Sequence, residues 1–266
     1  ARRGLDEPPR VTLRRHVSTA AAGAGSEQEF FARLTQAGVL VRPRLSARNP
    51  GEVTGYAVAL HGDTTKDGRP VWYGGGKLAA DLTWPKLRQR WNQADSMPRD
   101  RFTPAERNAI WEHAARAADD AAAQIRLLAG TDPASAADAA WAAGDTLHVA
   151  AAALGSRILR QAADAYDRAA RAPYGRIPRP SPAGNRLRHT ARLISAFAFV
   201  SGDRSLGQIT LITRLAALAE AVSVLHQAQQ HAAQAASALT AARRLHAAAD
   251  APVAHARREH APAHSA

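Results

Sequence analysis

The sequence contains no cysteine among its 266 residues, which excludes disulfide bonds, thiolate metal ligands and cysteine nucleophiles. Aromatic residues are also scarce, at 5% of the chain. No Gly-x-Ser-x-Gly turn of a serine hydrolase occurs. The glycine-lysine run at 74–77 lacks the phosphate-loop pattern, because Val71 and Leu78 stand where that pattern needs glycine and serine or threonine. We therefore find no catalytic constellation in this sequence.

Acidic residues are few relative to basic ones. Asp and Glu total 23 against 35 for Lys and Arg, which gives a formal net charge of +12 and a pI of about 11.2. Charge of this sign and size favours anionic partners, with nucleic acid as the leading candidate. The alternative is that the arginines only solvate the exposed faces of helices.

Long apolar runs are also missing. No run approaches the roughly 18 to 20 residues that a helix needs to cross a bilayer. We therefore expect a cytoplasmic protein that makes no contact with a membrane. The length of the chain suits one or two domains, with enough residues to bury a core.

The most informative segment is 51–91, which holds five of the fourteen aromatic residues and all three lysines of an otherwise alanine-rich chain. Residues 53–60 have the β-branched and aromatic content of a strand, and a second strand is predicted to start at Pro70. Asp67-Gly68 between them is a hairpin turn signal. Three glycines at 74–76 then let the backbone turn sharply.

Two helices and one further strand complete this unit. Ser26 and Glu29 have the spacing of a capping box, and the helix that follows is expected to stop at Gly38. Residues 39–41 then enter a strand. Thr83 can cap the last helix, in which Trp84, Leu87 and Trp91 recur at helical spacing. The sequence therefore predicts a small α+β module at 26–92, in the order helix, three strands, helix.

The segments 29–44, 52–60 and 71–91 resemble the region that follows the nuclease domain in relaxases, the mobilisation nucleases of conjugative and mobilisable elements. In that family a phenylalanine-rich helix leads into strands and then into a G…L…D(L/Y)T…(I/L)…R motif. The resemblance is to relaxase-type proteins of high-GC bacteria. The matching positions are Phe30, Phe31, Leu34, Gly38, Val41, Gly76, Leu78, Asp81, Leu82, Thr83, Leu87 and Arg90.

The catalytic features of that family are not visible here. Relaxases nick DNA with an early tyrosine and hold a divalent metal with a histidine cluster, but the first tyrosine here is Tyr56, inside a predicted strand. The eleven histidines include no His-x-His pair, and His226 and His231 are five residues apart, on different sides of a helix. We expect no cofactor in this chain, and a divalent metal only in a relaxase domain that this chain lacks. The chain begins at Ala1 and reads like the inside of a longer protein, so we expect a catalytically inactive fragment.

The remainder of the chain predicts an alanine-rich antiparallel helical bundle at 103–250. Thr103, Pro104 and Glu106 form a helix start with a cap, a first-turn proline and a capping-box acid. The predicted helices are 103–128, 134–170, 186–200 and 203–250, with a Pro/Arg-rich loop at 172–185. Residues 1–25 are expected to be a flexible basic lead-in, and residues 251–266 a disordered tail. The predicted fold class is therefore mostly α with one small α+β module.

The last predicted helix carries a heptad pattern of apolar residues. The pattern is typical of a buried core stripe, and pairing with another protein is the alternative. Alanine replaces the larger side chains further along, which favours an antiparallel bundle over a long coiled coil. The stripe consists of Leu211, Leu215, Leu218, Val222 and Leu225.

Two basic regions are candidate DNA contacts. The first lies beside Trp84 and Trp91, which we expect to be core residues while the cations of their helix face solvent. The second runs from Arg168 to Gly202 around the proline-rich loop, with seven arginines and no acid, and has Tyr174 as a possible stacking ring. The candidate residues are Lys77, Lys86, Arg88 and Arg90 in the first region and Arg171, Arg176, Arg179, Arg186 and Arg188 in the second.

These features leave two hypotheses. The resemblance implies the non-catalytic C-terminal region of a relaxase-like mobilisation protein, which assists plasmid mobilisation or conjugative transfer. Its partners would be DNA, bound weakly and in a salt-dependent way, and other transfer proteins bound through the C-terminal helices. The alternative is a helical scaffold or protein-interaction module with no nucleic-acid role.

Overall fold

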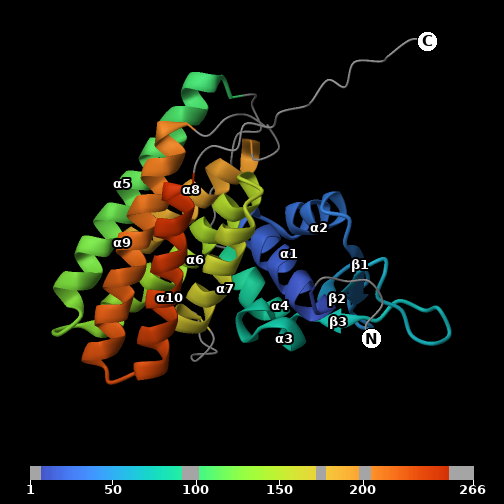
Figure 1. Ribbon diagram of the computed structural model, residues 1–266. Helices are drawn as coiled ribbons and strands as arrows, with labels where there is room; N and C mark the ends of the chain where they lie inside the picture. The colour runs from blue at the N-terminus through green and yellow to red at the C-terminus, as the bar shows by residue number, and fades with distance from the viewer. Residues whose placement is uncertain (1–6, 92–101, 172–177, 198–204, 252–266) are drawn as a thin grey trace, which may run out of the picture.

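A computed structural model describes residues 7–91, 102–171, 178–197 and 205–251. Figure 1 shows a helical bundle on one side and a small sheet with its own short helices on the other. Ten α-helices and one three-stranded antiparallel sheet make up the described residues. The predicted fold class is confirmed.

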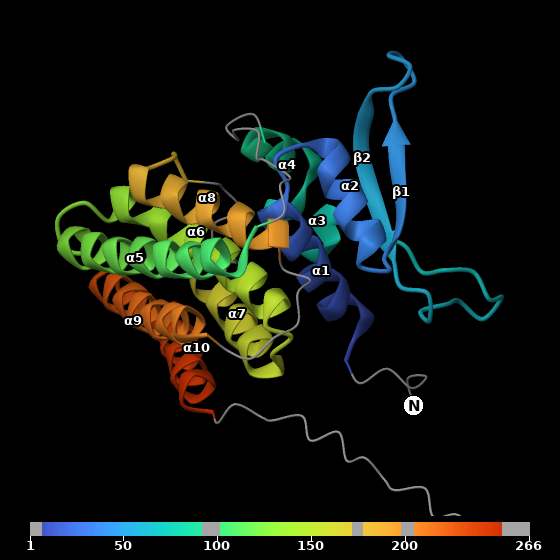
Figure 2. The same cartoon turned by 90° about the horizontal axis from the view of Figure 1, so that it is seen from above.

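The α+β module contains the strands in the order β1-β2-β3, with β2 in the centre. Figure 2 places helix α2 between the two long strands and the bundle. The elements of this part are α1 (Pro9–Gly23), α2 (Glu27–Gln36), β1 (Leu40–Leu45), β2 (Val53–Ala59), β3 (Tyr73–Gly74), α3 (Gly75–Leu78), a 3-10 turn (Ala80–Leu82) and α4 (Trp84–Trp91).

The capping and stop signals in the sequence predicted the position of α2 correctly. The Ser26 side chain accepts a hydrogen bond from the backbone N–H of Glu29 at 3.2 Å, which is half of the predicted capping box. The Glu29 carboxylate accepts from the Gly25 N–H at 2.9 Å instead of from Ser26. Gly38 follows the helix with a φ of +73°, a conformation that favours glycine.

The predicted second strand is shorter than expected. Gly68 forms the turn with a φ of +76°, and Thr64 pairs with Pro70 in an isolated bridge. Pro70 has no N–H to continue a ladder. Regular pairing therefore begins only at Tyr73, opposite Val58, and ends at Gly74.

Aromatic rings fill the core of the module. Phe30 of α2 lies 5.3 Å from the ring of Tyr56 and 5.4 Å from that of Trp91, centroid to centroid. The indole N–H of Trp84 donates to the Val53 carbonyl at 2.8 Å, so the ring is buried with its polar atom satisfied. Trp84 and Trp91 are therefore core residues, as the sequence predicted.

The prediction of a flexible lead-in is wrong from Pro9 onward. Helix α1 buries Leu13 and Val17, which lie four residues apart on one face. It packs on α2, α6 and α8. Arg14 reaches Asp164 of α7 at 2.8 Å, and Arg15 pairs with the same carboxylate. Asp164 thus pairs with two arginines that lie in the segment predicted to be flexible.

The bundle contains more helices than predicted. Its members are α5 (Pro104–Leu128), α6 (Pro133–Ala153), α7 (Arg157–Ala170), α8 (Pro182–Phe197), α9 (Leu206–Ala228) and α10 (Ala232–Asp250). The predicted helix 134–170 breaks at Gly155, which has a φ of +60°, and restarts where Ser156 caps Leu159. The predicted helix 203–250 breaks at Gln230, with a φ of +58°. Helix α8 starts at Pro182, four residues before the predicted start, because proline suits the first turn.

The heptad stripe is part of the bundle core. All five of its apolar side chains are at most 2% exposed, and α9 packs against α5 and α10. Helix α9 is long and apolar enough to span a membrane by length and composition alone, which the sequence analysis did not expect. Its apolar part is 61% buried inside the protein, as in the core helix of a bundle.

Candidate nucleic-acid interface

The predicted cations divide into buried and exposed groups. The side chains of Arg90, Arg171 and Arg188 are only 6%, 4% and 12% exposed, respectively. Lys77, Arg88, Arg179 and Arg186 are exposed. Lys86 is partly buried, and its ammonium donates to the Ala80 carbonyl at 2.7 Å. Arg176 lies outside the described residues, as does Tyr174.

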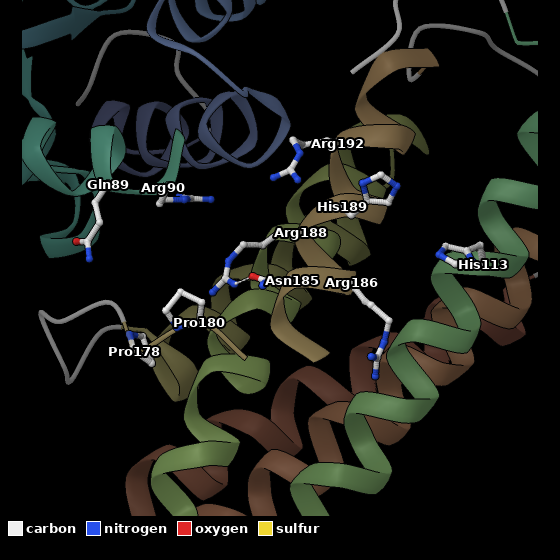
Figure 3. A pocket seen from close by; sticks show the side chains of 10 residues that line it. All are labelled: Gln89, Arg90, His113, Pro178, Pro180, Asn185, Arg186, Arg188, His189 and Arg192. Carbon is white, nitrogen blue, oxygen red and sulfur yellow. Dashed lines mark hydrogen bonds between the residues drawn. The ribbon is translucent and has the colours of Figure 1, made fainter. Parts of the chain in front are cut away.

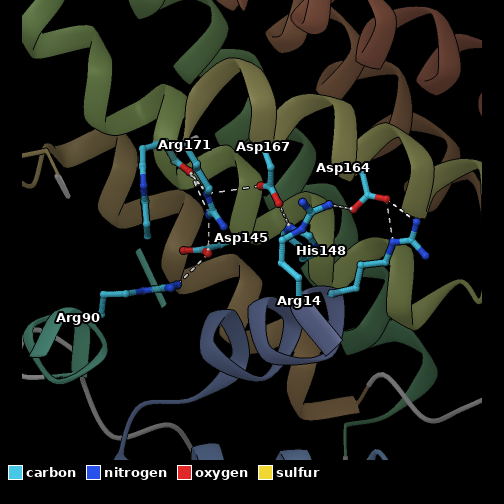
Figure 4. A network of polar contacts seen from close by, with 9 residues as sticks. Arg14, Arg90, Asp145, His148, Asp164, Asp167 and Arg171 are labelled. Carbon is cyan, nitrogen blue, oxygen red and sulfur yellow. Dashed lines mark hydrogen bonds and ion pairs between the residues drawn. The ribbon is translucent and has the colours of Figure 1, made fainter. Parts of the chain in front are cut away.

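Two of these buried cations, Arg90 and Arg171, share one carboxylate in a network drawn in Figure 4. Asp145 of α6 accepts from Arg90 of α4 at 2.7 Å and from Arg171, at the end of α7, also at 2.7 Å. Arg171 also donates to the carbonyl of Trp141 at 3.0 Å. The guanidinium groups of Arg90 and Arg171 lie 4.8 and 4.2 Å from the centre of the Trp141 ring.

The electrostatics of this network favour the charged form of Asp145. Burial opposes ionisation of the carboxyl, but the positive charges of Arg90, Arg171 and Arg188 outweigh burial and lower its pKa to about 2. Burial lowers the pKa of Arg90, although Asp145 favours its charged form. The network therefore holds mutually compensating charges that join the α+β module to α6 and α7.

Nearby contacts extend this network along α6. Arg188 of α8 pairs with Asp138, which also accepts from the backbone N–H of Ser181 at 2.7 Å. His148 and Asp167 are 2.8 Å apart. Burial raises and His148 lowers the pKa of Asp167, and the net effect lowers it below the usual value.

These contacts correct the predicted site. Arg90 does not face solvent with the other cations of its helix, because its guanidinium pairs with Asp145 of α6 and lies over the Trp141 ring. Arg171 is not part of an open loop, since it follows the end of α7 and its side chain donates to the Trp141 carbonyl and to Asp145. Three of the nine predicted DNA contacts, Arg90, Arg171 and Arg188, are therefore bound to buried aspartates.

Of these exposed cations, Arg186 lines a cleft between α4, α5 and α8, shown in Figure 3. It encloses about 290 Å³, and none of the described residues that line it is acidic. Outside the lining, Asp120 lies 4.0 Å from the Arg186 guanidinium, and both side chains are about half exposed or more. Such a pair neutralises little charge. The lining consists of Gln89, Arg90, His113, Pro178, Pro180, Asn185, Arg186, Arg188, His189 and Arg192.

Two histidines that line this cleft, His113 and His189, were not predicted from the sequence. His113 comes from α5, and His189 and Arg192 come from the same helix as Arg186. His189 and Arg192 follow Arg186 by three and six residues, so the helical spacing in the sequence could have grouped them. Nothing in the sequence placed α5 beside them.

The tyrosines and histidines form no nicking centre among the described residues. Tyr56 donates its hydroxyl to the Leu82 carbonyl at 2.7 Å, and burial raises its pKa. Tyr73 donates to Asp63 at 3.1 Å. Within the described parts of the chain, no three His, Asp or Glu side chains are grouped so that they could hold a metal ion.

The fold and the cleft thus define a mostly helical, basic protein with a small antiparallel sheet. Comparisons of this chain with protein-family models, with curated proteins and with solved structures found no match.

Proposed function

We propose that the chain is a non-catalytic, DNA-binding part of a relaxase-like mobilisation protein, acting in the cytoplasm during plasmid mobilisation. The observation that carries the DNA-binding role is the cleft beside α8, which Arg186 and Arg192 line and which has no acid in its described lining. A concave basic surface concentrates the positive potential that attracts a phosphate backbone. Transfer proteins that bind the outer surface of the helices are part of the same proposal.

The mobilisation role is supported by the residues that resemble the relaxase family. Leu78, Leu82 and Leu87 are buried, and Asp81 is buried beside them. Arg90 at the end of the motif ties the module to the bundle through Asp145. The resemblance therefore covers residues that build one folding unit, whereas the cleft residues on α8 lie outside it.

The test is a titration of the chain against fluorescent duplex and single-stranded DNA at several salt concentrations. We expect weak binding with a log–log salt slope near −3 to −5, because each contacted phosphate contributes about 0.7 to 0.9. Arg179→Ala with Arg186→Ala should reduce the steepness of that slope by about 1.4 to 1.8. The matched control is Arg157→Ala with Arg243→Ala, which removes two exposed charges from α7 and α10.

The outcome separates the two hypotheses from the sequence. Equal losses in both double variants mean that only net charge matters, and no binding at low salt removes the nucleic-acid role. The helical scaffold is then the better description of the chain.

A further inference from the structure

The outer face of the small sheet carries arginines that do not line the cleft beside α8. Helices lie on only one side of the sheet in Figures 1 and 2. On the other side, Arg42 of β1 stands opposite Ala57 of β2, and Arg44 stands opposite Gly55. Ala57 in turn pairs with Gly74 of β3. Two arginines therefore flank a strip of small residues.

This strip is the floor of a groove of about 620 Å³. It runs from Arg42 and Arg44 across β2 to Gly76 and on to Thr83. Pairing with β3 involves only Ala57 and Val58 of β2, so the half of β2 near Gly55 has no partner strand on that side. The groove lies beside this half of β2, where a longer β3 would otherwise pair with it.

The protein's own packing does not explain the glycine at position 74. Gly74 has a φ of −72°, which any residue adopts, and a Cβ there would lie 3.9 Å from its nearest neighbour, the Tyr56 carbonyl. Gly75 differs, since its Cβ would lie 2.1 Å from the Leu82 carbonyl oxygen. The open position of Gly74 leaves room for close approach of another molecule.

Charge and aromatic character indicate what that molecule is. Arg42 and Arg44 are exposed, and Arg44 donates only to Thr54 among the described contacts. The Arg42 guanidinium lies 4.6 Å above the ring of Trp72. Glu52, the residue before β2, lies 3.8 Å from Arg88 instead. The occupant is therefore anionic, extended and compatible with an aromatic surface.

We propose that this sheet face binds single-stranded nucleic acid. Its phosphates contact Arg42 and Arg44, and a base stacks at the Arg42–Trp72 pair, next to the groove that Arg42 lines. Cations next to an aromatic ring on an open sheet face suit an unpaired strand, whose bases can stack. A duplex fits less well, because its bases are hidden inside the helix. The inference rests on the proposed nucleic-acid role, but it names a second surface and a different strand state.

The test measures the anisotropy of a labelled oligothymidylate and of a labelled duplex, with three variants of the whole chain. Arg42→Ala with Arg44→Ala should weaken binding of the single strand about tenfold at low salt and make its salt slope shallower by about 1.4, with little change for the duplex. Gly74→Val fills the groove without changing charge and should also weaken single-strand binding. Arg157→Ala with Arg243→Ala is the charge control, and circular dichroism checks that each variant is folded.

The inference fails if both sheet variants bind the single strand like the control. If Arg179→Ala with Arg186→Ala still weakens DNA binding in that case, the proposed function stands without this surface. If polyglutamate competes as well as oligothymidylate does, the face binds acidic peptides and the inference is also wrong.

Discussion

Arg90 on α4 and Asp145 on α6 form an ion pair of 2.7 Å in which the two side chains are only 6% and 1% exposed. The pair joins the last helix of the α+β module to the centre of the bundle. Because Asp145 also binds Arg171, one carboxylate pairs with two buried cations, and Asp167 lies 3.8 Å from the second of them. Replacing Asp145 should therefore change the stability of the protein by a different amount than replacing either arginine.

Asp145→Asn should destabilise the protein strongly, by about 3 to 5 kcal/mol, since it leaves Arg90 and Arg171 buried without their shared counterion. Arg90→Met should cost less, because Asp145 keeps Arg171. Urea unfolding followed by circular dichroism measures both values. Asp119→Asn, at an exposed position of α5, is the control, and an equal effect of the two asparagine variants would contradict the role of the network.

Stability should fall in acid because of the same carboxylate. Its pKa is lowered from 3.8 unfolded to about 2 folded, so the ionised form stabilises the fold above the unfolded value. This contribution, of the order of 2 kcal/mol, is lost as pH falls from about 5 to about 2. Unfolding free energies measured across that range should decline less steeply for Asp145→Asn than for the original chain. Parallel curves would show that other carboxylates cause the decline.

Gly144→Ala should destabilise the protein, although alanine is better than glycine in a helix by roughly 1 kcal/mol. Gly144 lies inside α6, and a Cβ there would sit 2.7 Å from the Arg171 guanidinium. The variant must displace Arg171 from Asp145 or shift the helix. A thermal midpoint below that of the original chain is the expected result, and a higher midpoint would mean that Arg171 relaxes freely.

The comparison between sequence and structure depends on how local each signal is. The Thr103–Glu106 capping box and the Gly68 turn involve neighbours, and both are found where predicted. The burial of Arg90 depends on Asp145, which is 55 residues away, so helical spacing alone placed it on the wrong face. Gly144 was a usable signal, because a glycine within an alanine-rich helix indicates close packing.

The helix breaks were missed for a related reason. Alanine gives little periodic contrast, so the sequence pattern continued through Gly155 and Gln230. The cleft could be predicted only in part. The arginines of α8 were recognised, but their position beside His113 follows from the packing of α5 on α8.

The purified chain should not nick supercoiled plasmid with magnesium or manganese, nor form a covalent tyrosine–DNA adduct. Tyr56 is 7% exposed, its hydroxyl is bound to the Leu82 carbonyl, and burial raises its pKa, so it cannot reach DNA as a phenolate. Tyr56→Phe should instead lower stability by about 1 kcal/mol through loss of that hydrogen bond. Agarose gels of treated plasmid and urea unfolding of the variant check the two expectations. Site-specific nicking that disappears in Tyr56→Phe, or in Tyr73→Phe as a second test, would establish an active site in the module and overturn the non-catalytic role.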